Sequence, residues 1–233
     1  MTTAAIVLAG GSGSRMRRDD NKVFAQVHGL PLIAWSIRTF GRAPSVDHLI
    51  VVARAGEHTR IAAVVEAADL DIPVHTTIGG TTRQDSERAG LDVIARSTAL
   101  RDVELVLIHD AARPFATADL VERVIATTAA VGGAVPALPL DDGVYRTTSD
   151  GHLAPRPDDL YRMQTPQGFR TAALLDAYRR AADDGFAGVD TAETVQRYTS
   201  LEVAIVPGEA DNIKVTFSGD LAAAERIAAR HAV

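Results

Sequence analysis

The chain has 233 residues and a formal net charge of −6, and 46% of its residues are hydrophobic. This length suffices for one sizeable α/β domain, and the acidic balance argues against a role in coating nucleic acid. The absence of cysteine excludes disulfides, thiolate zinc sites and cysteine nucleophiles. No basic leader precedes the first apolar run and no run is long enough to span a membrane, so we expect a cytoplasmic protein without a membrane partner.

Short apolar runs alternate with helical patterns along the chain. The predicted strands cover 4–8, 48–53, 73–76, 104–108, 134–137 and 202–206, and the predicted helices cover 31–40, 57–68, 83–95, 117–130, 171–183, 190–198 and 218–230. This alternation is typical of an α/β fold with parallel strands and crossover helices, a doubly wound sheet. Ligands of such sheets bind beyond the carboxyl ends of the strands.

The first predicted strand leads directly into a loop rich in glycine and serine. The loop reads Leu8-Ala9-Gly10-Gly11-Ser12-Gly13, and the cations Arg15 and Lys22 follow it. Glycines let a backbone approach a ligand closely, and successive N–H groups make a concavity for phosphate oxygens. The loop therefore predicts polyphosphate binding, with a plain turn as the alternative. It is neither a P-loop nor a dinucleotide fingerprint, because no Gly-Lys-Ser/Thr follows and Met16 replaces the third glycine.

Two further segments carry polar groups where predicted strands end. Gly79-Gly80-Thr81-Thr82-Arg83-Gln84-Asp85-Ser86 is a glycine turn that opens a helix, and it could read a base edge or serve as an ordinary turn. His109-Asp110-Ala111-Ala112-Arg113 follows a buried strand. A carboxylate at Asp110 could meet a ribose or a magnesium ion, and Arg113 could bind a phosphate. The alternative is an Asp–Arg pair that only fixes the loop.

The segment 139–157 interrupts the alternation of strands and helices. Asp150-Gly151 between short alternating runs predicts a hairpin, and we expect a projecting β-arm that packs on a partner subunit in a homodimer. A disordered loop is the alternative. Further on, Lys214 stands in an apolar, strand-like run. A lysine in that setting needs a partner such as a phosphate, unless its ammonium extends to the surface.

Five motifs follow one another along the chain. They are the loop 8–16 with Lys22, Arg83-Gln84-Asp85-Ser86, His109-Asp110-Ala111-Ala112-Arg113-Pro114, Gln164-Thr165-Pro166-Gln167 and Asp211-Asn212-Ile213-Lys214. In this order they resemble the motifs of the 2-C-methyl-D-erythritol 4-phosphate cytidylyltransferases. The resemblance implies a single Rossmann-like nucleotidyltransferase domain over 1–233 and a homodimer through the β-arm 139–157. It also implies that the methylerythritol phosphate attacks the α-phosphorus of CTP, with magnesium, and that pyrophosphate leaves.

The resemblance also assigns roles by matched position. It implies catalytic roles for Arg15, Lys22 and Lys214. It implies CTP binding by Leu8, Ala9, Gly10, Gly11, Ser12, Gly13, Gly80, Thr81, Arg83, Ser86, Asp110 and Ala111, with Asp110 also the magnesium ligand. It implies binding of the polyol phosphate by Arg113, Arg156, Thr165, Asp190 and Asp211.

Three departures from the family pattern concern the acceptor. Gly143 and Val189 replace the usual residues, and Arg156 is one position off the usual spacing to Thr165. Ribitol 5-phosphate or another polyol phosphate is therefore an alternative acceptor. A nucleotide-binding sensor without catalysis is the alternative of a different class.

Overall fold

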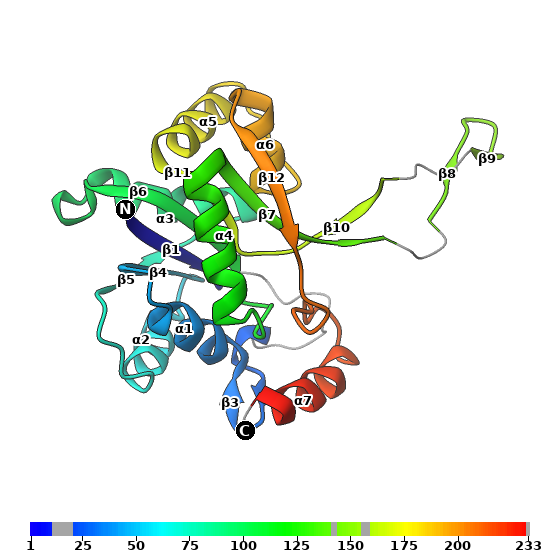
Figure 1. Ribbon diagram of the computed structural model, residues 1–233. Helices are drawn as coiled ribbons and strands as arrows, with labels where there is room; N and C mark the ends of the chain where they lie inside the picture. Colours follow the sequence, from blue (N-terminus) through cyan, green and yellow to red (C-terminus); the bar gives the residue numbers. More distant parts are fainter. Residues whose placement is uncertain (11–20, 141–143, 155–158, 232–233) are drawn as a thin grey trace.

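An eight-stranded sheet forms the centre of the computed structural model, which describes residues 1–10, 21–140, 144–154 and 159–231 (Figure 1). The strand order is β10-β7-β11-β6-β1-β4-β5, and β12 pairs with β7. The strands are β1 (Thr2–Leu8), β4 (His48–Ala53), β5 (Val74–Ile78), β6 (Val103–Asp110), β7 (Gly132–Pro139), β10 (Tyr161–Met163), β11 (Gln167–Arg170) and β12 (Glu202–Pro207). All six strands predicted from the sequence are present.

Two strands that the sequence pattern did not reveal run antiparallel to their neighbours in the sheet. β1 pairs in parallel with β4 and β6, and β4 with β5, whereas β11 lies antiparallel between β6 and β7. β10 is also antiparallel to β7. Both strands come after the arm in the chain. They run antiparallel to β7 because the chain leaves the sheet along β7 and returns in the opposite direction. The sheet is therefore mixed and mostly parallel.

Seven α-helices surround the sheet in the described part of the chain, at the positions that the sequence predicts. They are α1 (Leu32–Arg42), α2 (His58–Glu66), α3 (Arg83–Arg96), α4 (Ala118–Val131), α5 (Thr171–Asp183), α6 (Thr191–Tyr198) and α7 (Asp220–His231). The short elements are the 3₁₀ helices Lys22–Phe24 and Thr98–Leu100 and the small strands β2 (Gln26–Val27) and β3 (Leu30–Pro31). None of these helices combines the length and the apolar character that a membrane span requires.

The helices cover both faces of the sheet, as the doubly wound expectation requires. Ala5 and Val7 of β1 pack into one core with residues of α1, α2 and α4. Ala4 and Ile6 of the same strand pack into a second core with residues of α3, α5 and α6. Successive side chains of a strand point to opposite faces, so a strand buried on both faces is apolar throughout. This explains why β1 appears in the sequence as an uninterrupted apolar run.

The hairpin predicted around Asp150-Gly151 is present and projects from the sheet (Figure 1). Its strands β8 (Arg146–Thr147) and β9 (Leu153–Ala154) pair antiparallel. Gly151 has a φ of 85°, which a side chain rarely adopts, and this explains the glycine in the turn. Of the predicted arm 139–157, residues 141–143 and 155–157 lie outside the described residues.

Candidate active site

A cavity of about 640 Å³ opens at the carboxyl ends of β1, β4, β5 and β6, where the sequence places the ligand site. It is lined by Leu8, Gly10, Lys22, Val23, Arg54, Ala55, Gly79, Gly80, Thr81, Thr82, Arg83, Ser86, Asp110, Ala112, Lys214 and Thr216. The fold thus brings Leu8 and Gly10, the glycine turn, the strand-end carboxylate and both predicted lysines into one cavity. The site residues predicted from the sequence did not include Val23, Arg54, Ala55, Gly79, Thr82, Ala112 or Thr216.

Two predicted nucleotide-binding residues hold the strand ends together without lining the cavity. The N–H of Ala9 donates to the carbonyl of Val52, and the N–H of Ala111 donates to the carbonyl of Leu8, at 2.8 and 3.0 Å. Each bond extends the hydrogen-bonding pattern of two parallel strands by one residue, beyond the end of β1 at Ala9 and beyond the end of β6 at Ala111. The predicted site residues Gly11, Ser12, Gly13 and Arg15 lie outside the described residues.

Asp110 is the last residue of β6, and two cations hold its carboxylate. Lys214 Nζ lies 2.6 Å from Oδ2, and Arg83 Nε lies 3.1 Å from Oδ1. Burial alone would raise the pKa of Asp110, but the charges of Arg83 and Lys214 outweigh it and hold the pKa well below its usual range. Asp110 is therefore ionised at neutral pH. The predicted strand-like run around Lys214 is irregular instead, and its partner within the chain is this carboxylate.

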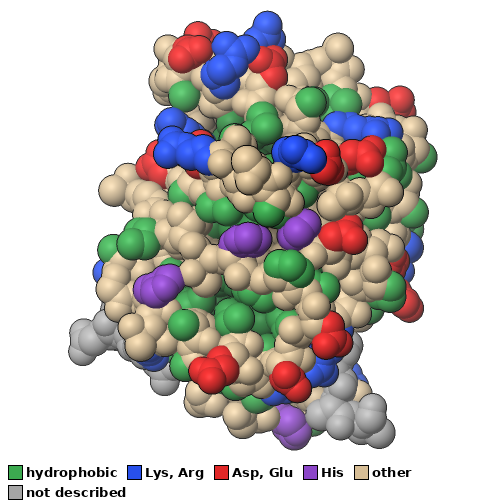
Figure 2. All heavy atoms as spheres, turned by 90° about the vertical axis from the view of Figure 1, so that its left-hand side faces the viewer, with side chains coloured by type: hydrophobic (Ala, Val, Ile, Leu, Met, Phe, Trp, Pro, Cys, Tyr) green, Lys and Arg blue, Asp and Glu red, His purple; other side chains and the backbone are tan. Residues whose placement is uncertain are grey.

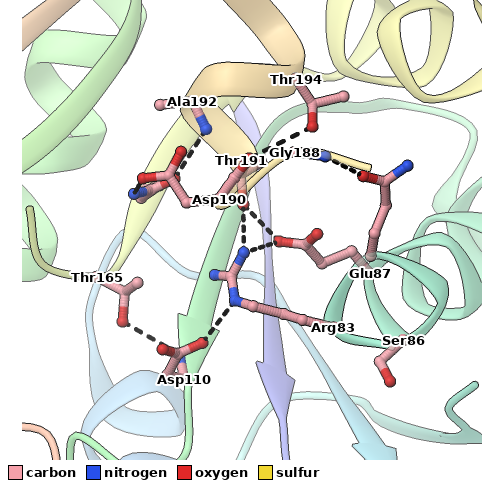
Figure 3. A network of polar contacts seen from close by, with 12 residues as sticks. Arg83, Ser86, Glu87, Asp110, Thr165, Gly188, Asp190, Thr191, Ala192 and Thr194 are labelled. Carbon is pink, nitrogen blue, oxygen red and sulfur yellow. Dashed lines mark hydrogen bonds and ion pairs between the residues drawn. The ribbon is translucent and has the colours of Figure 1, made fainter. Parts of the chain in front are cut away.

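Figure 3 shows that Arg83 belongs to a larger polar network. Its Nη1 lies 2.5 Å from Oε1 of Glu87, one turn further along α3. Glu87 is 2% exposed and also accepts hydrogen bonds from Thr191 and Tyr178. The sequence analysis missed Glu87, although an arginine followed four positions later by an acid is a recognisable helical pair.

Lys22 enters the cavity from the segment that follows the glycine loop. Its Nζ donates to the carbonyl of Val215 at 2.9 Å, beside the segment that carries Lys214. The preceding Asn21 donates through Nδ2 to the carbonyl of Ala9 and to Oε2 of Glu57, at 2.8 and 2.7 Å. These bonds hold Asn21, the residue before Lys22, against the residue that follows β1 and against Glu57.

The glycine turn packs closely against the first turn of α3. Thr82 and Asp85 form a reciprocal capping box that starts the helix. Ser86 Oγ donates to the carbonyl of Thr82 at 3.0 Å. A Cβ at Gly79 would lie 2.6 Å from Ser86 Oγ, so a larger residue here would displace the Ser86 side chain or the turn. The turn therefore presents backbone groups to the cavity at short range.

A buried chain of hydrogen bonds supports Asp110 from behind. The N–H of Asp110 donates to Oγ1 of Thr165 at 3.1 Å, and Thr165 Oγ1 lies 3.0 Å from Nδ1 of His109. His109 Nε2 lies 3.0 Å from the carbonyl of Arg113, so Nε2 carries the proton and Nδ1 accepts from Thr165. Burial lowers the pKa of His109 to about 4, which keeps the ring neutral.

The other predicted acceptor residues are not among the described lining residues of the cavity. Arg113 donates to the carbonyls of Asn212 and Met163, at 2.8 and 3.2 Å. Asp190 caps α6 and accepts from Gln167 Nε2 at 2.9 Å, and Asp211 accepts from Arg230 at 2.7 Å. The predicted acceptor residue Arg156 lies outside the described residues. The structure thus brings together the predicted CTP residues more completely than the acceptor residues.

Asp110 fits a magnesium ion only as a single protein ligand. Among the described residues, no group of three or more His, Cys, Asp or Glu side chains could hold a metal ion. The histidine side chains that gather on the face shown in Figure 2 do not form such a group either. Magnesium commonly takes one or two carboxylates and completes its shell with substrate phosphates and water. The residues present fit that arrangement, in which the nucleotide supplies further ligands.

A doubly wound sheet with cations and one carboxylate around a cavity at its strand ends is the arrangement of a nucleotide-binding transferase, the nucleotidyltransferase class. A family model described as 2-C-methyl-D-erythritol 4-phosphate cytidylyltransferase matches residues 3–230. The chain therefore belongs to the 2-C-methyl-D-erythritol 4-phosphate cytidylyltransferase family. The resemblance seen in the sequence motifs is confirmed.

Individual relatives agree with this assignment. Proteins named 2-C-methyl-D-erythritol 4-phosphate cytidylyltransferase from Cereibacter sphaeroides and Syntrophus aciditrophicus are 38% and 34% identical, covering 98% and 95% of this chain and 98% and 93% of their own lengths. The crystal structure of the Thermus thermophilus cytidylyltransferase of that name is 32% identical, with a TM-score of 0.76 over 98% of this chain and 100% of that one. The 4-diphosphocytidyl-2C-methyl-D-erythritol synthase from Anaerococcus prevotii has a TM-score of 0.85 at 28% identity, over 98% and 99% of the two chains.

Proposed function

We propose that the cavity binds CTP and that the residues around it transfer the cytidylyl group to 2-C-methyl-D-erythritol 4-phosphate. The products are 4-diphosphocytidyl-2-C-methyl-D-erythritol and pyrophosphate, in isoprenoid biosynthesis. Membership in the family supports the reaction. One observation supports its location, which is that Asp110 lies between Lys214 and Arg83 in the same cavity as the glycine turn.

In this reaction an oxygen of the acceptor's phosphate attacks the α-phosphorus of CTP. The new P–O bond forms as the bond between the α-phosphorus and the bridging oxygen breaks, and the electron pair leaves with pyrophosphate. Both reactants are anions, so catalysis consists mainly of positioning them and stabilising the negative charge. Lys22 and Lys214 contribute two cations to the cavity for this purpose. Arg15 is proposed as a third, on the sequence motif alone.

The glycine turn provides the proposed site for the cytosine base. Gly80, Thr81 and Ser86 line the cavity beside the first turn of α3. The backbone N–H and C=O groups of such a turn can form hydrogen bonds with a base edge at close range. Leu8, Gly10 and the loop beyond them provide the proposed phosphate site.

Asp110 is the residue that would hold a magnesium ion, together with phosphate oxygens of CTP. Such an ion would offset the charge of the phosphates and orient the reacting group. The carboxylate is already ionised because Arg83 and Lys214 keep its pKa low. Metal binding at Asp110 therefore requires no loss of a proton at neutral pH.

The acceptor site is proposed to include Thr165, Arg113, Asp190 and Asp211, completed by Arg156 of the arm. Exposed apolar side chains on the arm, Tyr145 at 56% and Leu153 at 71%, support its packing against a second subunit.

The proposal also covers the organisation of the protein. It consists of a single domain over 1–233 with the arm 139–157, and it forms a homodimer through the arm. Its proposed location is the cytoplasm, and it has no nucleic-acid or membrane partner.

The function is tested by following pyrophosphate release from CTP and magnesium with each of two acceptors. We expect release with 2-C-methyl-D-erythritol 4-phosphate and none with ribitol 5-phosphate. Release with ribitol 5-phosphate alone would assign the chain to the activation of another polyol phosphate, an outcome that the changes at Gly143 and Val189 leave open. CTP binding without release with either acceptor would favour a nucleotide sensor.

A further inference from the structure

Glu87 is a buried carboxylate that the proposed reaction has not used. It lies on α3 with 2% exposure, and three donors contact it. They are Arg83 Nη1 at 2.5 Å, Thr191 Oγ1 at 2.6 Å and Tyr178 OH at 2.7 Å. Burial raises the pKa of Glu87, while the charge of Arg83 and the hydrogen bonds from Thr191 and Tyr178 oppose this by favouring the ionised form. Glu87 is therefore the buried acidic partner of Arg83, one turn further along α3 (Figure 3).

Arg83 lies between two carboxylates and contacts each with a different nitrogen. Nη1 faces Glu87, while Nε lies 3.1 Å from Oδ1 of Asp110. Because the guanidinium is planar and rigid, a contact at one edge fixes the direction of the other nitrogens. The position of Glu87 thus determines how Arg83 approaches Asp110.

The balance of charges around Arg83 also indicates that Glu87 affects how Arg83 contacts Asp110. Arg83 and Lys214 supply two positive charges, and Asp110 and Glu87 supply two negative charges. Without the charge of Glu87, Arg83 would keep Asp110 as its only acidic partner. The guanidinium would then compete more strongly for the carboxylate that the nucleotide site needs, since a buried charge is costly without a partner.

The same helix also contacts the segment that precedes α6. Thr191, the first residue of α6, donates to Glu87. Gln84 donates through Nε2 to the carbonyl of Phe186 at 2.7 Å, and its Oε1 accepts from the N–H of Gly188 at 2.8 Å. This segment, 186–191, contains the proposed acceptor residue Asp190. One turn of α3 therefore joins the nucleotide side of the site to its acceptor side.

We propose that Glu87 is a positioning residue for the cytidylyl transfer. It holds Arg83 in the orientation that sets the Asp110 carboxylate at the nucleotide site, and through Thr191 it ties that orientation to segment 186–191. This inference rests on the proposed role of Asp110 in binding the nucleotide. It predicts that loss of the Glu87 charge weakens CTP binding because the position of Arg83 changes, and not because the packing of α3 changes.

The test begins with Glu87→Gln, which keeps the size of the side chain and removes its charge. We expect the dissociation constant of CTP, measured by calorimetry, and kcat/KM for CTP each to worsen by about tenfold or more, as for loss of a charged buried hydrogen bond. Asp92→Asn is the matched control, because Asp92 forms an exposed i,i+4 pair with Arg96 on the same helix. It should leave both constants unchanged.

A double variant separates positioning from a general structural role. If Glu87 acts through Arg83, then Glu87→Gln should cause less than about a twofold further loss in an Arg83→Gln background. Additive losses, or wild-type CTP binding by Glu87→Gln, would overturn the proposal. If Glu87→Gln does not fold, Tyr178→Phe and Thr191→Val remove one donor each, and wild-type binding by both would overturn it equally. Pyrophosphate release with neither acceptor would contradict the proposed reaction. Calorimetry of CTP binding would still test the role of Glu87 in that case, because it does not require turnover.

Discussion

Lys214 Nζ lies 2.6 Å from Asp110 Oδ2, although the two residues are 104 positions apart in the chain. The contact joins an irregular segment after β12 to the carboxyl end of β6. It places an ammonium group at the cavity and, together with Arg83, keeps the carboxylate ionised. The two groups on which the proposed chemistry most depends are thus each other's partners.

Loss of the lysine charge should impair the transfer severely. We expect Lys214→Ala and Lys22→Ala each to lower kcat/KM by about 100-fold or more, because preorganised charges act mainly on the transition state. Pyrophosphate release under saturating magnesium measures the effect. Arg96→Ala, at a side chain that is 82% exposed on α3, is the control for loss of one positive charge. Near wild-type turnover in either lysine variant would remove that lysine from the proposed mechanism.

Asp110→Asn should change the dependence on magnesium. The variant retains the shape of the side chain but loses the charge that would hold the ion. We expect the magnesium concentration for half-maximal activity to rise by about tenfold or more, since an amide is a much weaker ligand than a carboxylate. An unchanged magnesium titration would show that the ion is held without Asp110.

His109 should make the folded chain sensitive to acid. Its pKa is lowered by burial from 6.5 to about 4, so the unfolded chain binds a proton that the folded chain excludes. The contribution to stability is complete above pH 6.5 and declines as the pH falls toward 4, by roughly 3 kcal/mol in all. The free energy of unfolding, measured by denaturant titration between these pH values, should depend less steeply on pH for His109→Gln than for the wild type. His58→Gln, at an exposed position, is the control, and equal slopes in all three proteins would contradict the prediction.

Gly79→Ala should weaken CTP binding more than it slows turnover. The added Cβ would lie 2.6 Å from Ser86 Oγ and 3.0 Å from Val52 Cγ1, so the Ser86 side chain or the turn must shift. We expect KM for CTP to rise by about tenfold, because a displaced backbone loses its hydrogen bonds to the base. Gly219→Ala adds the same atom in open space and should bind CTP normally. A Gly79→Ala protein with an unchanged KM would exclude the turn from the base site.

The arm should determine both subunit association and binding of the acceptor. Replacement of 140–159 by a short glycine–serine linker is expected to give a monomer in analytical ultracentrifugation. Arg156→Ala should leave the dimer intact and raise KM for the acceptor far more than KM for CTP. An arm-less protein that remains dimeric would contradict the role of the arm in subunit association. Equal effects of Arg156→Ala on the two KM values would contradict its role in acceptor binding.

The sequence by itself determined the doubly wound fold and several of the residues that line the cavity at the strand ends. The apolar run of β1, the glycines after it and the carboxylate at the end of β6 are local features. Parallel strands place their carboxyl ends at one edge, so such features can be combined before any contact is known. For the same reason, all six predicted strands and the helices between them are found where the periodicity places them.

Tertiary structure alone decided the features that depend on distant pairing. β11 is a four-residue strand that becomes part of the sheet only because β6 and β7 leave room for it between them. Glu87 has the sequence appearance of an ordinary exposed helix residue, and its burial follows from the packing of α5 and α6 over α3, which supply Tyr178 and Thr191. The partner of Lys214 was likewise undetermined, because only the fold brings Asp110, 104 positions away in the chain, to within 2.6 Å of its ammonium group.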